Sequence, residues 1–122
     1  MTFKILVVDD SAMSRRSLKR VLESNGYAVI EAVDGISALE TYHLERPDLV
    51  MLDMLMHGMY GLDVLSKLRE IDVSARVVVV TADIQHSTKA MALEGGAMGF
   101  VTKPFAADVV LETVAGILSK GA

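Results

Sequence analysis

The stretch that decides the fold is KILVVDD, which runs from Lys4 to Asp10. Its first part, Lys4–Val8, is a short run that is almost wholly apolar, and two acids follow it directly. Continuous apolar runs of this length are typical of strands buried on both faces, as in a parallel sheet. The two acids then stand at the carboxyl end of a strand, which is where open α/β sheets bind their ligands. The segment therefore predicts both a parallel sheet and the edge at which to look for its site.

Runs of the same kind recur four times further along the chain. They are Ala28–Ala32, Leu49–Leu52, Arg76–Thr81 and Gly99–Thr102. The Ala28–Ala32 run alternates more between apolar and polar residues than the others do, which favours a place nearer an edge of the sheet. Five strands are therefore expected.

The segments after these runs have helical periodicity. Asp34 can cap the second helix and Pro47 prevents its continuation, while the fourth is expected from about Ile84 to Leu93. The helical faces are marked by Leu18, Val21 and Leu22, by Ala38, Leu39 and Tyr42, by Leu62, Leu65 and Leu68, and by Val110, Val114 and Ile117. Short right-handed crossovers then give a (βα)5, doubly wound α/β fold with five helices around a five-stranded parallel sheet.

Length and composition restrict the class of protein. The 122 residues suit one domain over positions 1–122, and 52% of them are hydrophobic. Because there is no cysteine, disulfides and thiolate metal sites are excluded. A net charge of −4 without a long basic run argues against direct nucleic-acid binding. No signal peptide or apolar stretch near the ~20 residues of a membrane span is present, so we expect a soluble, cytoplasmic domain without membrane partners.

Five polar residues stand where the expected strands end. Asp9 and Asp10 follow the first strand, Asp53 ends the third, Thr81 ends the fourth and Lys103 follows the fifth. In a parallel sheet these positions converge on one edge. Two like charges ~4 Å apart repel by about 4 kcal/mol at an effective dielectric constant near 20, so three carboxylates need compensation. Lys103 supplies one positive charge, and an all-oxygen site would add Mg²⁺ or Mn²⁺.

A functional interpretation gives each group a role. Asp53 is the nucleophile that forms an acyl phosphate, and the metal is held by Asp10 and Asp53 with Asp9 close by. Lys103 and the Thr81 hydroxyl bind the remaining phosphoryl oxygens. Each residue alone also has an ordinary role, as a helix cap, a strand residue or a solvated charge. Five suitable residues at the ends of four strands favour a metal and phosphate site.

Four motifs in order resemble the response-regulator receiver family over nearly the whole chain. They are VVDDSAMSR at residues 7–15, PDLVMLDMLMHGMYG at 47–61, VVVTA at 78–82, which ends in Thr81-Ala82, and GAMGFVTKPF at 96–105. The resemblance implies a CheY-like, flavodoxin-like fold with strand order 2-1-3-4-5. It also implies a phospho-accepting signalling domain rather than a conventional enzyme, one that assists its own phosphorylation and dephosphorylation.

The resemblance also implies roles for single residues. Asp9 and Asp10 would be the acidic pair and Asp53 the phospho-acceptor, while the backbone carbonyl of Leu55 would be a metal ligand. Positions such as Leu55 and Asp83 influence water access to the acyl phosphate in this family. Asp83 can equally cap the following helix, and the two roles are compatible.

The same resemblance implies a switch. Thr81 and Phe100 would be the switch pair, in which phosphoryl binding draws in the hydroxyl and turns the ring inward. Lys103 would contact the phosphoryl group, and its bond to Pro104 would be cis. The signal would then change the face formed by the fourth helix, the fifth strand and the fifth helix.

The chain departs from the family pattern beside the site. His57 stands where proline is common, Tyr60 where aspartate is frequent, and Phe100 where tyrosine is commoner. An imidazole at position 57 could make phosphorylation or metal binding depend on pH, or it could be a solvent-facing loop residue. Both interpretations of His57 stay open.

The family implies phosphorylation by a histidine kinase or a phosphotransfer protein and control of a downstream protein target. The TADIQ run at residues 81–85 resembles receivers associated with CheC/CheX-type phosphatases. The main alternative is a pseudo-receiver that binds partners without being phosphorylated. An aspartyl phosphatase of the haloacid-dehalogenase type would usually carry an Asp at position 55, where this chain has Leu55. A flavin carrier would not place the negative charges of Asp9 and Asp10 beside the flavin phosphate.

Overall fold

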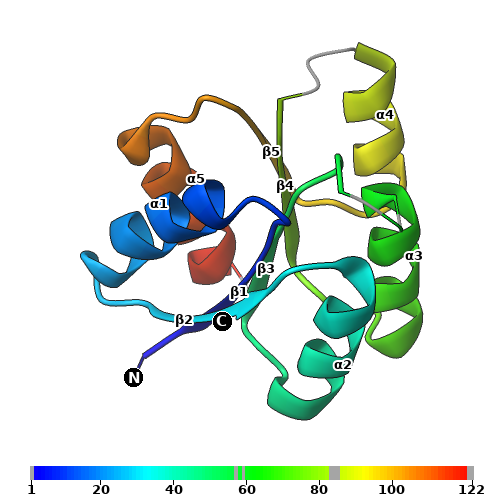
Figure 1. Cartoon of the computed structure of the whole chain (residues 1–122), viewed down its shortest axis with the longest axis horizontal. Coiled ribbons are helices and arrows are strands. Elements are labelled where there is room, and N and C mark those ends of the chain that lie inside the picture. The colour runs from blue at the N-terminus through cyan, green and yellow to red at the C-terminus, as the bar shows by residue number, and fades with distance from the viewer. Residues whose placement is uncertain (1, 57, 59, 83–85, 121–122) are drawn as a thin grey trace.

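The computed structural model describes residues 2–56, 58, 60–82 and 86–120, and over these residues strands alternate with helices (Figure 1). The elements are β1 (Lys4–Val8), α1 (Ala12–Glu23), β2 (Ala28–Ala32), α2 (Gly35–Glu45), β3 (Leu49–Leu52), α3 (Gly61–Ile71), β4 (Val77–Thr81), α4 (His86–Glu94), β5 (Gly99–Thr102) and α5 (Ala107–Lys120). The α/β alternation predicted from the sequence is confirmed.

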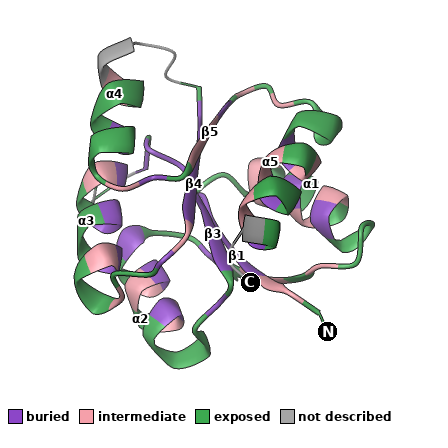
Figure 2. Ribbon diagram, turned by 180° about the vertical axis from the view of Figure 1, so that it is seen from behind, coloured by how far each residue is buried: buried purple, intermediate pink, exposed green. Residues whose placement is uncertain are grey.

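The strands form one parallel sheet in the order β2-β1-β3-β4-β5, which confirms the expected topology. Strands β3 and β4 are buried at every position, as strands covered on both faces must be (Figure 2). Strand β2 has a more exposed pattern and lies at one edge, as its alternation predicted. Strand β2 is added on one side of β1 and strands β3 to β5 on the other, so the strand order changes direction between β1 and β3, where ligands of doubly wound folds bind.

Two apolar layers hold the sheet between its helices. On one face, α2, α3 and α4 pack against alternate strand residues such as Leu6 and Val50. On the other face, α1 and α5 pack against the intervening residues such as Ile5 and Met51. Figure 1 shows the same division, with α1 and α5 on one side of the sheet and α2, α3 and α4 on the other. This packing fixes the carboxyl ends of the strands along one edge.

Local sequence signals explain several element ends. Asp34 caps α2 through a capping box with Ser37, and Arg46 leaves the helix in the left-handed conformation just before Pro47. Strand β4 begins at Val77, one residue later than predicted. The predicted start of the fourth helix at Ile84 lies outside the described residues. Within the described part of the chain, no helix combines the length and apolar character of a bilayer span.

Candidate metal centre at the carboxyl edge of the sheet

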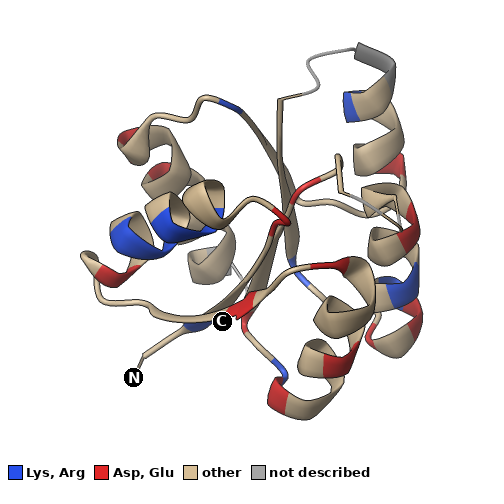
Figure 3. Cartoon of the chain, in the orientation of Figure 1, with Lys and Arg blue, Asp and Glu red and all other residues tan. Residues whose placement is uncertain are grey.

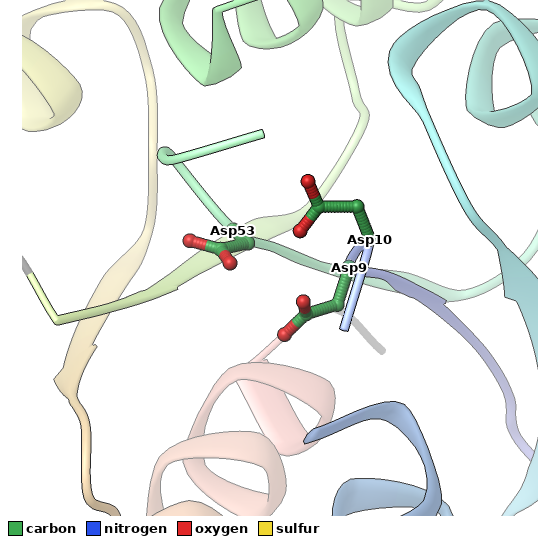
Figure 4. A group of neighbouring side chains, drawn as sticks. All are labelled: Asp9, Asp10 and Asp53. Atoms are coloured by element: carbon green, nitrogen blue, oxygen red, sulfur yellow. The ribbon is translucent and has the colours of Figure 1, made fainter. Parts of the chain in front are cut away.

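Three carboxylates meet beyond the ends of β1 and β3. Asp9, Asp10 and Asp53 each offer an oxygen within 4.8 Å of those of the other two (Figure 4). Asp9 and Asp53 are buried, with 1% and 6% of their surface exposed, whereas Asp10 is exposed. The Asp53 backbone N–H donates to the carbonyl of Val8 at 3.0 Å, so the β1–β3 ladder itself places Asp53 beside the acid pair.

Asp9 is held from both its backbone and its side chain. Its N–H donates to the carbonyl of Ala32 at 3.2 Å, which extends the pairing between β1 and β2. Its Oδ1 accepts from the backbone N–H of Ser11 at 2.8 Å, while the Ser11 hydroxyl caps α1. The turn from strand to helix therefore fixes the direction of the Asp9 carboxylate.

Lys103 lies against two of the three acids. Its Nζ donates to Asp9 Oδ2 at 2.6 Å and to Asp53 Oδ2 at 3.1 Å. The Lys103–Pro104 peptide bond is cis, and the Lys103 backbone N–H donates to the carbonyl of Thr81 at 2.8 Å. Three carboxylates and this one ammonium leave the described cluster with a formal charge of −2.

The excess of negative charge affects how the cluster holds protons. Burial raises the pKa of the Asp53 carboxyl, and the nearby Asp9 charge adds to this, although the Leu55 N–H and Lys103 act in the opposite direction. Burial alone would lower the pKa of Lys103, but its hydrogen bonds and charge interactions with Asp9 and Asp53 raise it overall. The two shifts in pKa thus have different causes, because burial disfavours the charged form of Asp53 while the two neighbouring carboxylates favour the charged form of Lys103.

The structure also places the other predicted residues. Thr81 is fully buried at the end of β4, in register with Thr102 of β5. The backbone N–H of Leu55 donates to Asp53 Oδ1 at 3.0 Å, while Leu55 as a whole is 54% exposed. The backbone at this position, rather than its side chain, therefore borders the cluster.

Phe100 lies on β5 and is half-buried. The Nζ of Lys89 from α4 lies 5.9 Å from the centre of its ring, within the range of a cation–π contact. A hollow of about 450 Å³ opens here, lined by Lys89, Phe100, Val101, Thr102, Pro104, Ala106 and Val109. This hollow lies on the predicted signalling face.

Some predicted residues have no described role in the geometry. His57 and Asp83 lie outside the described residues, so their interpretations stay predictions. Ala82 is exposed and lines a second hollow of about 490 Å³, together with Met13 and Phe105. Tyr60 is exposed at the residue before α3.

Two residues at the site were not predicted from the sequence. A Cβ on Gly61 would lie 2.5 Å from Met54 Cα and 2.9 Å from the carbonyl oxygen of Asp53, so only glycine fits there without a shift. Arg15 donates through Nη1 to the carbonyl of Asp9 at 2.7 Å. Gly61 belongs to the motif at residues 47–61, but the sequence does not reveal its close contact with the backbone. The contact between Arg15 and the Asp9 carbonyl corresponds to no periodic pattern in the sequence.

The donor set fits a hard divalent cation. Figure 3 shows acidic residues at the carboxyl ends of β1 and β3 and basic residues along α1. All candidate ligands in the cluster are carboxylate oxygens, which suit Mg²⁺ or Mn²⁺. A cation of charge +2 would balance the formal charge of the cluster. The residues present therefore fit such an ion.

Comparisons with known proteins agree with this geometry. The family described as the response regulator receiver domain matches residues 5–115. The chemotaxis protein CheY of Bacillus subtilis is 41% identical over 115 residues, which cover 93% of this chain and 96% of that protein. The response regulator MprA of Mycobacterium ulcerans is 38% identical over 120 residues, which cover 98% of this chain but 52% of MprA. The chain thus spans about half the length of that relative.

Solved structures give the same result. The crystal structure of a CheX-CheY-BeF3-Mg complex from Borrelia burgdorferi matches with a TM-score of 0.90 and 34% identity, covering 94% of this chain and 88% of that one. A CheY-like receiver domain protein from Methanospirillum hungatei matches with a TM-score of 0.94 and 26% identity, covering 98% and 96%. The likeness therefore extends over nearly the whole chain.

Proposed function

This chain belongs to the response regulator receiver family, and from that premise we propose that Asp53 accepts a phosphoryl group in a Mg²⁺-dependent reaction. The proposal treats residues 1–122 as one receiver domain. The observation that carries it is the position of Lys103, whose ammonium contacts both Asp9 and Asp53. Because the Lys103 ammonium is held beside these two buried acids, it can also bind the oxygens of a phosphoryl group at the same place.

Asp53 is better suited to attack than Asp9. Lys103 holds Asp9 Oδ2 at 2.6 Å but Asp53 Oδ2 at 3.1 Å, so the Asp53 oxygen is the less tightly bound. In the step, an Asp53 oxygen forms a bond to phosphorus while the bond between phosphorus and the donor's leaving atom breaks. Lys103 and the Thr81 hydroxyl stabilise the phosphoryl oxygens.

The metal site is proposed at Asp10, Asp53 and the backbone carbonyl of Leu55, with Asp9 close by. A bound Mg²⁺ would neutralise charge on the transferred oxygens. Asp10 is the exposed member of the cluster, which suits a ligand at the solvent side. Leu55 already contacts Asp53 through its backbone N–H, which keeps its main chain at the site.

The proposed switch uses Thr81 and Phe100. The Lys103 N–H donates to the Thr81 carbonyl, so the two residues that would bind the phosphoryl group are also joined through their backbones. Drawing them toward phosphate would shift the packing of α4, β5 and α5, where Lys89 contacts the Phe100 ring. This is a shift between two populations, driven by the extra contacts of the phosphorylated state.

The proposed partners follow from the same chemistry. A histidine kinase or a phosphotransfer protein would supply the phosphoryl group, and a downstream protein would bind the changed face. A CheC/CheX-type phosphatase is a further candidate, because one similar structure is that of a CheX-CheY complex.

The proposal is tested with acetyl phosphate and Mg²⁺, followed by intact mass measurement. We expect one phosphoryl adduct on the parent protein, none on Asp53→Asn, and an unchanged adduct on Asp63→Asn, which alters an exposed acid of α3. Chelation of the metal should abolish the adduct. A parent protein that forms no adduct would favour the pseudo-receiver, whereas an adduct that persists in Asp53→Asn would move the acceptor elsewhere.

A further inference from the structure

We infer that Arg15 is a positioning residue for the Asp9–Asp10 acid pair, and that it sets the affinity of the cluster for a divalent cation. This inference rests on the proposed function, because it concerns the same metal site. Arg15 is not a member of the cluster, and its side chain contacts Asp9 only through the backbone carbonyl. Its effect is therefore transmitted through the peptide between the two acids.

The contact fixes one particular peptide. The carbonyl oxygen of Asp9 belongs to the peptide bond that joins Asp9 to Asp10, just beyond the end of β1. Arg15 Nη1 donates to that oxygen at 2.7 Å, a short bond strengthened by the positive charge. The orientation of this peptide determines where the Asp10 side chain leaves the backbone. Arg15 therefore restrains the backbone from which the exposed Asp10 side chain extends.

Arg15 is itself anchored on β2. Its side chain is only 16% exposed, and its Nε lies 3.4 Å from Glu31 Oε1, while Lys19 lies 3.6 Å from the other Glu31 oxygen. Among the described atoms, Arg15 Nε is buried and makes no hydrogen bond of good geometry, so Glu31 holds the guanidinium by charge attraction rather than by a directed hydrogen bond. Ala32, the next residue of β2, accepts the Asp9 N–H. Neighbouring residues of β2 thus hold Asp9 from two sides, one directly and one through Arg15.

The planar guanidinium explains why arginine suits this place. Its separate nitrogens lie near the Asp9 carbonyl and the Glu31 carboxylate at the same time, whereas a lysine presents a single charged nitrogen. Groups that orient metal ligands commonly change metal affinity by 10- to 100-fold when they are removed. The adjacent Arg16 is exposed on α1, so it offers a control with the same change in net charge.

The test is the affinity for Mg²⁺ alone, measured by isothermal titration calorimetry on the unphosphorylated protein. For Arg15→Met we expect a dissociation constant about tenfold higher than that of the parent. Arg15→Lys should recover part of the loss by donating to Asp9, and Arg16→Met should match the parent. At saturating Mg²⁺, the rate of adduct formation in Arg15→Met should approach the parent rate, because the defect lies in binding. The amide resonance of Asp10 in the metal-free protein should also move in Arg15→Met and not in Arg16→Met.

A folded Arg15→Met protein that binds Mg²⁺ as tightly as the parent would overturn the inference and leave the proposed function intact. If Arg15→Met does not fold, Glu31→Gln provides the test, since this change removes the charge that holds Arg15 and keeps the arginine itself. Unchanged Mg²⁺ affinity in Glu31→Gln would then contradict the inference. A parent protein that binds Mg²⁺ but forms no adduct would defeat the proposed function without touching the role of Arg15.

Discussion

Lys103 Nζ donates to Asp9 Oδ2 at 2.6 Å, although 94 positions separate the two residues. The contact joins the end of β5 to the end of β1, and β3 and β4 lie between these strands in the sheet. No backbone ladder can make this connection, so a long side chain must reach over the strand ends. The long side chain of Lys103 thus borders the acid cluster on the side of β5.

Replacing Lys103 by Met keeps an apolar stem of similar length and removes the ammonium. We expect the rate of adduct formation with acetyl phosphate to fall about 100-fold or more at saturating Mg²⁺, since one lost donor to a developing anion has effects of this size. The time course of the intact mass measures this rate. Lys67→Met, at an exposed position of α3, is the matched control. A Lys103→Met rate near that of Lys67→Met would contradict the assigned role.

Because the charge of the cluster is not balanced without a metal, we expect Mg²⁺ to reverse the order of stability of the parent and Asp53→Asn. Without Mg²⁺, Asp53→Asn should be more stable than the parent by about 1 kcal/mol, because it removes one of two carboxylates buried together. With Mg²⁺ at about 100 times its dissociation constant, the parent should gain about 2.7 kcal/mol from binding and become the more stable protein. Urea unfolding in the presence and absence of Mg²⁺ measures both. An unchanged order would argue that the ion does not bind at Asp53.

Gly61 should be needed for the position of Asp53. In Gly61→Ala the new Cβ would press on Met54 Cα and on the Asp53 carbonyl, so the loop after β3 must shift. We expect a loss of about 1–3 kcal/mol in the free energy of unfolding and slower adduct formation. Gly116→Ala on α5 is the control, because its Cβ meets nothing within 4 Å and should stabilise the helix by up to about 1 kcal/mol. Equal effects of the two changes would refute the steric argument.

Tyr42 makes stability depend on alkaline pH. Burial, followed by the hydrogen bond that its hydroxyl donates to Asp72 at 2.9 Å, raises the pKa of Tyr42 to about 12 from its ordinary value of 10.0. A folded-state pKa above the unfolded value means that this contribution is fully present below about pH 10 and is lost as the pH rises toward 12. Tyr42→Phe should therefore cost about 1 kcal/mol near neutral pH.

The difference between Tyr42→Phe and the parent should narrow between about pH 10 and pH 12. Urea midpoints at several pH values measure this difference. Tyr60→Phe, at an exposed position, should show no such dependence. A constant difference for Tyr42→Phe across this range would show that the hydroxyl proton is not involved.

Much of the fold could be predicted because the strands carry strong local signals. The runs Lys4–Val8, Ala28–Ala32, Leu49–Leu52 and Gly99–Thr102 match the observed strands at both ends. Burial on both faces requires apolar residues at successive positions, and this pattern is visible without any partner. The predicted strand Arg76–Thr81 is one residue too long, because the long stem of an arginine does not interrupt an apolar run.

The cluster itself could also be anticipated, since residues at the ends of parallel strands meet at one edge. The contacts that fix the acid cluster at that edge could not be predicted from the sequence. Arg15 acts through a backbone carbonyl and depends on Glu31 from another strand, and neither contact has a fixed spacing. Gly61 is limited by the path of the backbone near Asp53, which exists only in the folded chain.

The most direct test of the central claim is a crystal structure of the protein with Mg²⁺ and beryllofluoride, which imitates an aspartyl phosphate. The account predicts beryllium bonded to an oxygen of Asp53, Lys103 and Thr81 contacting the fluorides, and Mg²⁺ held by Asp10 and Asp53. Beryllofluoride absent from Asp53, or Mg²⁺ bound away from these acids, would contradict it.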